Sequence, residues 1–315
     1  MMNFNRPLTR RESLRTLFNL SGALTLTGAA VGALKSPLSA WSAPGKKFLV
    51  EAVGQVPGYN IKSLTRKAFD AAGGISRFIA RGDVVVIKPN LSWARAPQFG
   101  ATTHPEVLQA VIELCQEAGA RRVRIADNTI HDARRCFAVT GAGLVAKNTG
   151  AELIHPRSSM MREMDLKGNL LGSWPVFVPL VEADKLINLP VAKHHSLSSL
   201  TLGMKNWIGA VDGSRWSLHQ DIDESIVDLS RFFKPTVTLI DAIRIMTRNG
   251  PSGGSTADVA PKHTLILSDD PVAADAGAAQ LFGRRPDQLG FVRLAQKSGL
   301  GTYDFSTLDR RRVLL

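Results

Sequence analysis

Four basic side chains stand in an apolar, glycine-containing stretch at residues 189–211, namely Lys193, His194, His195 and Lys205. An unpaired cation is costly in an apolar environment, so these groups need an opposite charge, a hydrogen-bonding partner or a ligand. Histidine changes its charge near neutral pH and suits acid–base catalysis, whereas lysine holds carboxylate or phosphate oxygens as a point charge. We therefore interpret the stretch as one wall of a ligand site. A structural lysine with satisfied hydrogen bonds is the alternative for Lys205.

The spacing of these residues limits what they do together. Neighbouring residues point to opposite sides of a strand and diverge by about 100° on a helix, so His194 and His195 are poor joint ligands of one ion. One of the two is expected to face the site while the other packs elsewhere. Thr201 and Lys205 are four residues apart, and a helix would place both on one face with Asn206 beside them.

Polar residues also stand where strand-like runs end. Lys88 and Asn90 follow VVVI, Asp127 follows VRIA, Asp241 follows VTLI, and Asp275 lies about one turn into a helix after HTLILSDD. Ligands bind beyond the carboxyl ends of the strands in open α/β sheets, so these ends are expected to share one site. Aspartate and asparagine also favour turns, and a turn-forming role is the alternative for any one of them.

The elements that must position these residues alternate along the chain. Short runs rich in Val, Ile and Leu predict strands, and helical patterns stand between several of them. Nearly all-apolar strands in this order indicate an α/β fold with a mainly parallel sheet covered by helices on both faces. Five runs are expected to be strands of that sheet: 84–87, 123–125, 186–188, 237–240 and 265–267. The long interval around 190–234 predicts an insertion or cap.

The first 43 residues resemble a twin-arginine export signal. Arg10 and Arg11 precede a weakly apolar segment at residues 17–34. We predict delivery to the periplasm, with the twin-arginine translocase as a partner during export, and a single α/β domain at residues 44–315. An uncleaved membrane anchor is the alternative, and the polar residues and glycines within the segment argue against it.

The chain of 315 residues has a formal net charge of +12, of which the signal segment carries +4. Its basic residues are scattered rather than gathered in a stripe interleaved with aromatic side chains, which argues against binding of nucleic acid. The one dense run, Arg310, Arg311 and Arg312, is interpreted as a solvated tail. A small anionic ligand fits this charge distribution better.

Two cysteines are present, Cys115 and Cys136. Cys115 falls on the apolar side of a helical pattern, which predicts a buried core thiol. A disulfide with Cys136 is the alternative in an oxidising compartment. Two cysteines cannot supply a four-thiolate iron–sulfur cluster, and the sequence contains no CxxC, HExxH or P-loop pattern.

In their order along the chain, these motifs resemble the uncharacterised domain-of-unknown-function family 362. The matching positions are Lys88-Pro89-Asn90; Thr103-His104-Pro105; Leu189-Pro190 with Lys193 and His195; Thr201, Lys205-Asn206 and Gly209; Asp241 with Gly250-Pro251 and Gly254; and Asp270-Pro271-Val272-Ala273 with Asp275. The resemblance covers nearly all of the chain after the signal. Many relatives carry a ferredoxin-like cysteine-rich module, which this chain lacks, so no iron–sulfur cluster is expected. The family implies no established reaction.

Two classes of function follow. In the first, a periplasmic enzyme acts on a small anionic substrate, with His195, Lys205 and Lys88 as catalytic groups and His195 as general acid or base. The residues expected to bind its ligand are Asn90, Lys193, Thr201 and Asn206. In the second class, the protein captures a cofactor or metal as a redox-accessory protein without turnover.

The carboxylates complete the expected site. Asp127, Asp241 and Asp275 are expected to bind a hard cation such as Mg²⁺, or to orient the basic groups. All of these strand-end and helix-start residues are expected to converge around one cavity, because neighbouring strands lie about 4.8 Å apart.

Overall fold

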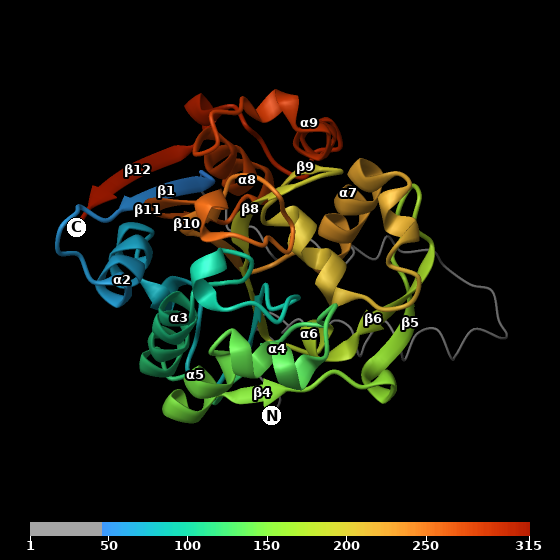
Figure 1. Ribbon diagram of the computed structural model, residues 1–315, viewed down its shortest axis with the longest axis horizontal. Coiled ribbons are helices and arrows are strands. Elements are labelled where there is room, and N and C mark those ends of the chain that lie inside the picture. The colour runs from blue at the N-terminus through green and yellow to red at the C-terminus, as the bar shows by residue number, and fades with distance from the viewer. Residues whose placement is uncertain (1–45) are drawn as a thin grey trace, which may run out of the picture.

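The computed structural model describes residues 46–315, and the predicted export signal lies outside the described residues. In this part of the chain no helix is both long and apolar enough to cross a membrane. Figure 1 shows the course of the chain from β1 to the carboxyl terminus, which ends in β12 beside β1.

A ten-stranded sheet organises the molecule, and eight of its strands form one path in the order β12-β1-β11-β10-β7-β2-β3-β4. These eight are β1 (Phe48–Val53), β2 (Val84–Pro89), β3 (Arg122–Ala126), β4 (Glu152–Ile154), β7 (Lys185–Leu189), β10 (Val237–Met246), β11 (Val259–Ser268) and β12 (Asp309–Leu314). All five runs that the sequence predicts as strands belong to this sheet. The prediction of a mostly parallel α/β sheet is confirmed, and its parallel part is β10-β7-β2-β3-β4. β11 runs antiparallel to its neighbours β10 and β1.

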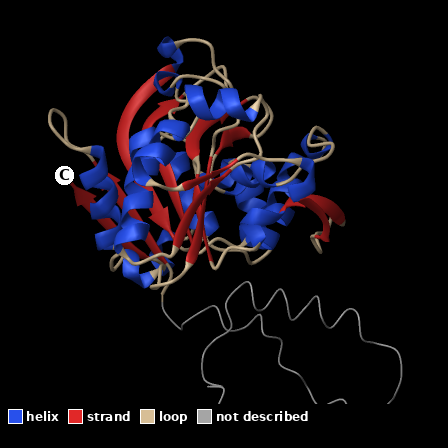
Figure 2. Cartoon of the chain, turned by 90° about the horizontal axis from the view of Figure 1, so that it is seen from below, coloured by secondary structure: helices blue, strands red, loops and turns tan. Residues whose placement is uncertain are grey.

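Helices cover both faces of the sheet (Figure 1, Figure 2). On one face, Val85 and Ile87 of β2 pack in a core with residues of α2 and α3, whereas Val86 between them packs in another core on the opposite face. This alternation is the reason why the strand is apolar along its whole length. The helices are α2 (Ile61–Ala71), α3 (Pro105–Glu117), α4 (Ala133–Val139), α5 (Ala142–Thr149), α6 (Val178–Val181), α7 (Ile222–Phe233), α8 (Pro271–Gln280) and α9 (Gly290–Lys297).

The starts of two helices that border the site follow from local sequence. α3 has Pro105 in its first turn, where the missing N–H of proline leaves no helical hydrogen bond unmade. α8 likewise begins at Pro271, and the Asp270 carboxylate accepts hydrogen bonds from the N–H groups of Val272 and Ala273. These caps determine where the chain turns after β11 and before α3.

The predicted insertion continues the sheet and then covers it. Pro190 interrupts the strand after β7, and β8 (Val191–His195) runs on beside β10. β9 (Ser199–Thr201) returns antiparallel to β8. A 3₁₀ helix, η5 (Met204–Ala210), follows, and a second one, η6 (Ser217–His219), precedes α7. A separate hairpin of β5 (Met161–Asp165) and β6 (Ser173–Phe177) meets the end of η5 through a bridge between Val176 and Val211.

Two expectations about local structure are wrong. Thr201 lies in β9 and Lys205 in η5, so no single helix carries both; Gly203 between them lowers helix propensity. Residues 310–312 are exposed to solvent as predicted, but they are not a tail, because β12 pairs in parallel with β1 over residues 309–314. That pairing joins the two ends of the described chain and has no local signal in sequence.

The two cysteines are buried and free. Cys115 is fully enclosed in the core on the α3 face, which confirms the prediction of a core thiol, and burial raises its pKa to about 12. The alternative of a disulfide with Cys136 is not realised in the structure.

Candidate functional site

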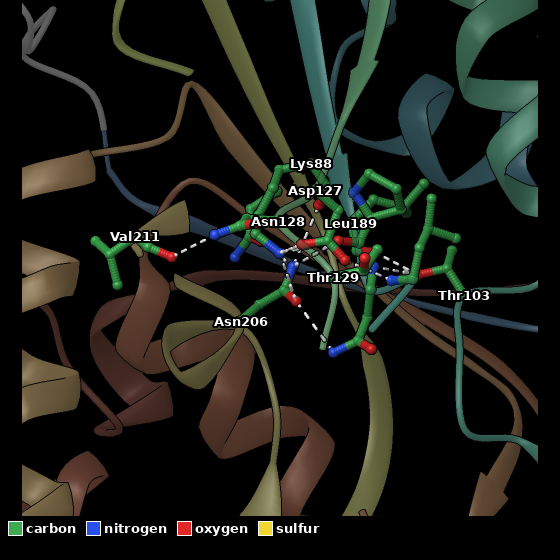
Figure 3. Close-up of polar contacts among 12 residues, drawn as sticks. Lys88, Thr103, Asp127, Asn128, Thr129, Leu189, Asn206 and Val211 are labelled. Carbon is green, nitrogen blue, oxygen red and sulfur yellow. Dashed lines mark hydrogen bonds and ion pairs between the residues drawn. The ribbon is translucent and has the colours of Figure 1, made fainter. Parts of the chain in front are cut away.

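A buried ion pair lies at the carboxyl ends of β2 and β3 (Figure 3). The Lys88 amine donates to the Asp127 carboxylate over 2.5 Å, and both side chains are 0% exposed. The second carboxylate oxygen of Asp127 accepts the Leu91 N–H at 2.7 Å. Burial lowers the pKa of Lys88, and the attraction of Asp127 opposes that shift. The pair therefore has its charges and hydrogen bonds satisfied internally.

Asn206 ties η5 to the strand ends (Figure 3). Its amide oxygen accepts from Lys88 Nζ and from Asn90 Nδ2, each at 3.2 Å. Its Nδ2 donates to Asn188 Oδ1 at 2.9 Å and to the Lys88 carbonyl oxygen at 3.2 Å. Because Lys88 and Asn188 face each other in the β2–β7 pair, one amide side chain links both strands to the covering segment.

Gly209 lets η5 approach this network closely. A Cβ at this position would lie 2.5 Å from Asp127 Oδ1 and 2.9 Å from Lys88 Nζ, which leaves no room for a side chain. The Gly209 carbonyl oxygen also accepts the Asn128 N–H at 2.9 Å. The glycine is therefore needed for contact with the ion pair rather than for an unusual backbone angle.

Lys193, on β8, is a second buried lysine with partners. Its amine donates to the Ala101 carbonyl oxygen and to Asn90 Oδ1, the latter at 3.3 Å. Burial is the main cause that lowers its pKa to about 7. Asp127 raises this pKa, while the charges of Lys205 and Lys88 lower it.

Lys205 differs from these two lysines. It is 5% exposed, and within residues 46–315 its amine makes no hydrogen bond and no ion pair. Burial alone lowers its pKa to about 7. A structural lysine of this burial is expected to have acceptors around its amine, and none of the described residues supplies one.

A buried hydroxyl without a partner lies beside these lysines. Thr201 faces Lys193 directly in the β8–β9 pair, so both side chains stand on the same face of the sheet. Thr201 is 4% exposed, and its Oγ1 has no hydrogen-bond partner among the described residues. Buried polar atoms are nearly always hydrogen-bonded, which makes this hydroxyl a group available to a ligand.

The two adjacent histidines diverge as expected. His195 is two residues after Lys193 on β8 and shares its face, whereas His194 turns to the loop where the Gly250 N–H donates to its Nδ1. His195 Nδ1 accepts the Leu197 N–H at 3.1 Å, so the neutral ring carries its proton on Nε2. Burial and then the charge of Lys205 lower the pKa of His195 to about 3.

His219 and Arg215 are site residues that the sequence analysis missed. The rings of His195 and His219 stack with centroids 5.8 Å apart and 14° between their planes. His219 Nδ1 donates to the Arg215 carbonyl oxygen at 3.1 Å, which leaves its Nε2 as an acceptor. Burial lowers the pKa of His219, and the charge of Lys205 adds to that effect. Arg215 lies in a turn and His219 ends the short 3₁₀ helix η6, and neither has a motif or periodicity that marks it in the sequence.

Arg215 links the segment that carries His219 to the loop after β3. Its guanidinium donates to the carbonyl oxygens of Asn128 at 2.7 Å and Thr129 at 3.1 Å, on the loop that follows β3. Trp216, beside it, stacks on His219 and is 74% exposed. The segment that carries His219 is thus fixed to the carboxyl end of β3.

The three carboxylates predicted to hold a cation each accept hydrogen bonds from different partners. Asp275 accepts the N–H groups of Gly203 and Met204 at 2.6 and 3.0 Å, and burial raises its pKa to about 7. Asp241 accepts the N–H groups of His104 and Ile243 at 2.7 and 3.0 Å. Within residues 46–315, no three His, Cys, Asp or Glu side chains are grouped as ligands for a metal ion. In the structure Asp127 holds Lys88, which is the alternative role predicted for these carboxylates, and Asp241 and Asp275 orient backbone segments.

The predicted convergence holds in part. Hydrogen bonds join Lys88, Asn90, Asp127, Lys193 and Asn206 in one network. Lys205 and His195 lie beside it and are coupled by charge. Asp275 acts through the backbone at the start of η5, and Asp241 holds the start of α3. Asn188, which the sequence analysis read as the last residue of a strand, also belongs to the network.

The fold and these contacts define an α/β protein whose polar, mainly basic site lies at the carboxyl ends of parallel strands. The chain belongs to the family described as "Domain of unknown function (DUF362)", whose model matches residues 85–280. The resemblance seen in the sequence motifs is thereby confirmed.

The chain is similar to one curated protein and, more weakly, to one solved structure. "Thylakoid-associated protein sll1697" of Synechocystis sp. (strain ATCC 27184 / PCC 6803 / Kazusa) is 26% identical over 243 residues, which are 75% of this chain and 74% of that protein. Among solved structures, the lactate racemase apoprotein from Thermoanaerobacterium thermosaccharolyticum matches with a TM-score of 0.43 at 11% identity. That match covers 74% of this chain and 56% of the other chain, so the chain spans little more than half of that structure.

Proposed function

We propose that this protein is an enzyme that acts on a small anionic substrate, a carboxylate or a phosphate. The observation that carries the proposal is Lys205, a 5% exposed lysine whose amine has no partner within the described residues. A buried ammonium group is strongly destabilising unless an opposite charge compensates it. A bound anion supplies that compensation.

The charges around Lys205 favour an anion over a cation. Lys193, His195 and His219 lie near enough to interact with its charge. The nearby carboxylate of Asp127 is engaged by Lys88 and by the Leu91 N–H. The buried Thr201 hydroxyl adds a neutral donor for an oxygen of the ligand.

The histidines are suited to proton transfer in different roles. The hydrogen bond at His195 Nδ1 leaves an Nε2–H that donates to a substrate oxygen. The hydrogen bond from His219 Nδ1 leaves an Nε2 lone pair that accepts a proton. We assign His219 as the general base and His195 as the hydrogen-bond donor, because a pKa of about 3 keeps His195 neutral at physiological pH.

The test is calorimetric titration of the purified protein with acetate, succinate and inorganic phosphate. Lys205→Met is expected to weaken binding of at least one of these anions by about tenfold or more, since one buried charge–charge contact is lost. Lys62→Met is the matched control, because it removes the same charge from a partly exposed lysine paired with Glu113. Unchanged affinity in Lys205→Met, or equal losses in both variants, would contradict the proposal.

Turnover separates this function from capture without chemistry. Mass analysis of the protein purified in its native state identifies any small molecule that it retains, and incubation with that molecule shows whether it is converted. Conversion that His219→Gln abolishes supports the enzyme. Retention of an unchanged molecule by wild type supports the redox-accessory or binding class instead.

We also propose that the protein reaches the periplasm by the twin-arginine route, which rests on Arg10 and Arg11 before an apolar segment. Replacing both residues by lysine is expected to retain the precursor in the cytoplasm, because ammonium groups do not reproduce the planar guanidinium contacts. Cell fractionation measures this. Undiminished periplasmic protein in the double variant would favour the general secretory route.

A further inference from the structure

The three buried lysines of the site differ in what holds their amines. Lys88 donates to Asp127, and Lys193 donates to Ala101 and Asn90, whereas Lys205 has no acceptor within residues 46–315. Lys88 donates three hydrogen bonds, to Asp127, Asn206 and the Pro89 carbonyl oxygen, so its nitrogen holds three protons. Lys193 is held by two acceptors, which leaves Lys205 as the one of these three lysines whose amine no acceptor within residues 46–315 holds in place.

The surroundings of Lys205 disfavour its protonated form. Burial removes most of the water around the Lys205 side chain, which is 5% exposed, and Lys193 and the two histidines contribute no negative charge beside it. Its pKa of about 7 means that about half of the amine is neutral near pH 7. Desolvation in an apolar site is one of the features that activate lysines for covalent catalysis.

We propose that Lys205 is an amine nucleophile that forms an imine with the carbonyl group of a small oxo acid. The inference rests on the proposed function, and it names the reaction and the substrate class: a carboxylate with an adjacent aldehyde or ketone. Lys193 holds the carboxylate by charge, and the Thr201 hydroxyl, on the same face of the sheet, donates to it.

The step balances without an oxidant or reductant. The lone pair of Lys205 Nζ attacks the carbonyl carbon, and the π electrons of the C=O bond move to the oxygen. That oxygen takes a proton while the nitrogen loses one, which gives a carbinolamine. Loss of water then forms the C=N bond. His219 Nε2 accepts the proton that nitrogen loses and, as the imidazolium, returns it to the oxygen, while His195 keeps its proton and stabilises the oxygen through a hydrogen bond from Nε2–H. Both rings are close enough to interact with the charge of Lys205.

The experiment traps the imine by reduction. The full-length protein is incubated near pH 7 with glyoxylate and cyanoborohydride, digested with trypsin and analysed by mass spectrometry. Alkylation at Lys205 blocks cleavage there and produces an uncut peptide of residues 194–215 that carries the adduct. Alkylation at Lys193 would instead produce an uncut peptide of residues 186–205. The two sites are thus distinguished by the peptide alone.

The expected result is labelling at Lys205 at least about tenfold faster than at the partly exposed Lys62, because the lowered pKa of Lys205 leaves about half of its amine neutral near pH 7. Glycolate, which has the carboxylate but no carbonyl, is expected to give no adduct and to slow labelling by competition. Lys205→Met is expected to lose the labelled peptide while retaining labelling elsewhere.

The outcomes separate this inference from the function on which it rests. If wild type binds anions in a Lys205-dependent way but forms no adduct, the imine is wrong and the anion site stands. If Lys193 or exposed lysines label as fast as Lys205, the imine is also wrong. If Lys205→Met binds anions like wild type, the proposed function fails, whatever the labelling shows.

Discussion

Replacing Lys205 by methionine is expected to stabilise the fold. Methionine has a similar length and no charge, and the Lys205 amine has no partner within the described residues that the change would leave unsatisfied. The pKa of Lys205 falls from 10.5 to about 7, so at neutral pH its burial destabilises the fold by roughly 4 kcal/mol, at about 1.4 kcal/mol per tenfold change in the protonation equilibrium. If Lys205→Met removes half of this destabilisation, Tm is expected to rise by roughly 4–8 °C.

The pH dependence of the free energy of unfolding tests whether burial of Lys205 destabilises the fold. Between pH 7 and 10.5 the unfolded chain holds a proton on Lys205 that the folded chain has released, so the stability of wild type rises with pH in that window. Lys205→Met lacks this contribution. The stability difference between variant and wild type is therefore expected to be largest below about pH 7 and to vanish toward pH 10.5.

Two variants serve as controls, with the free energy of unfolding measured by urea denaturation at several pH values. Lys193→Met removes a lysine with the same lowered pKa but leaves two acceptors, Asn90 Oδ1 and the Ala101 carbonyl oxygen, without a donor. Each orphaned group costs about 1–3 kcal/mol, which offsets the gain. Lys62→Met is expected to change little. A loss of stability in Lys205→Met, or a pH-independent difference, would refute the reasoning and restore a structural role for this lysine.

Three further predictions concern the groups that hold the site. Asp127→Asn leaves Lys88 buried without a counter-charge and is expected to lower the free energy of unfolding by about 3–5 kcal/mol in urea denaturation; a loss below 1 kcal/mol would contradict a buried ion pair. Gly209→Ala places a Cβ against the same pair and is expected to destabilise by about 1–3 kcal/mol, with Gly172→Ala, where a Cβ meets open space, as the control. Asp275 has its pKa raised from 3.8 to about 7, so wild-type stability falls as pH rises through that window; Asp275→Asn is expected to flatten the thermal-stability profile there, and an unchanged slope would assign the titration to other groups.

Local sequence was sufficient for the secondary structure and for the class of fold. β2 is a continuous apolar run that packs on both faces of the sheet, and such a run has few other stable placements. The starts of α3 and α8 were marked by proline in the first turn and, for α8, by an aspartate cap. These signals act within a few residues, so they can be read without knowledge of the rest of the fold.

The strand-end rule also located part of the site. Lys88, Asn90 and Asp127 were expected to meet because parallel strands present their carboxyl ends at one edge, and hydrogen bonds through Asn206 join them there. The same rule was wrong for Asp241, which it placed at the end of a strand. That residue is partway along β10, a strand of ten residues that continues beside β8, and its carboxylate holds the start of α3.

Tertiary structure alone decided which charges are paired. Whether a lysine is satisfied depends on the acceptors that other segments bring to it: β3 brings Asp127 to Lys88, the loop after β2 brings Ala101 to Lys193, and no described segment brings an acceptor to Lys205. His219 became part of the site only because η6 packs its ring against His195 of β8, and residues 310–312 became a strand only through β1. Burial and pairing are non-local, and a residue's type and spacing do not contain them.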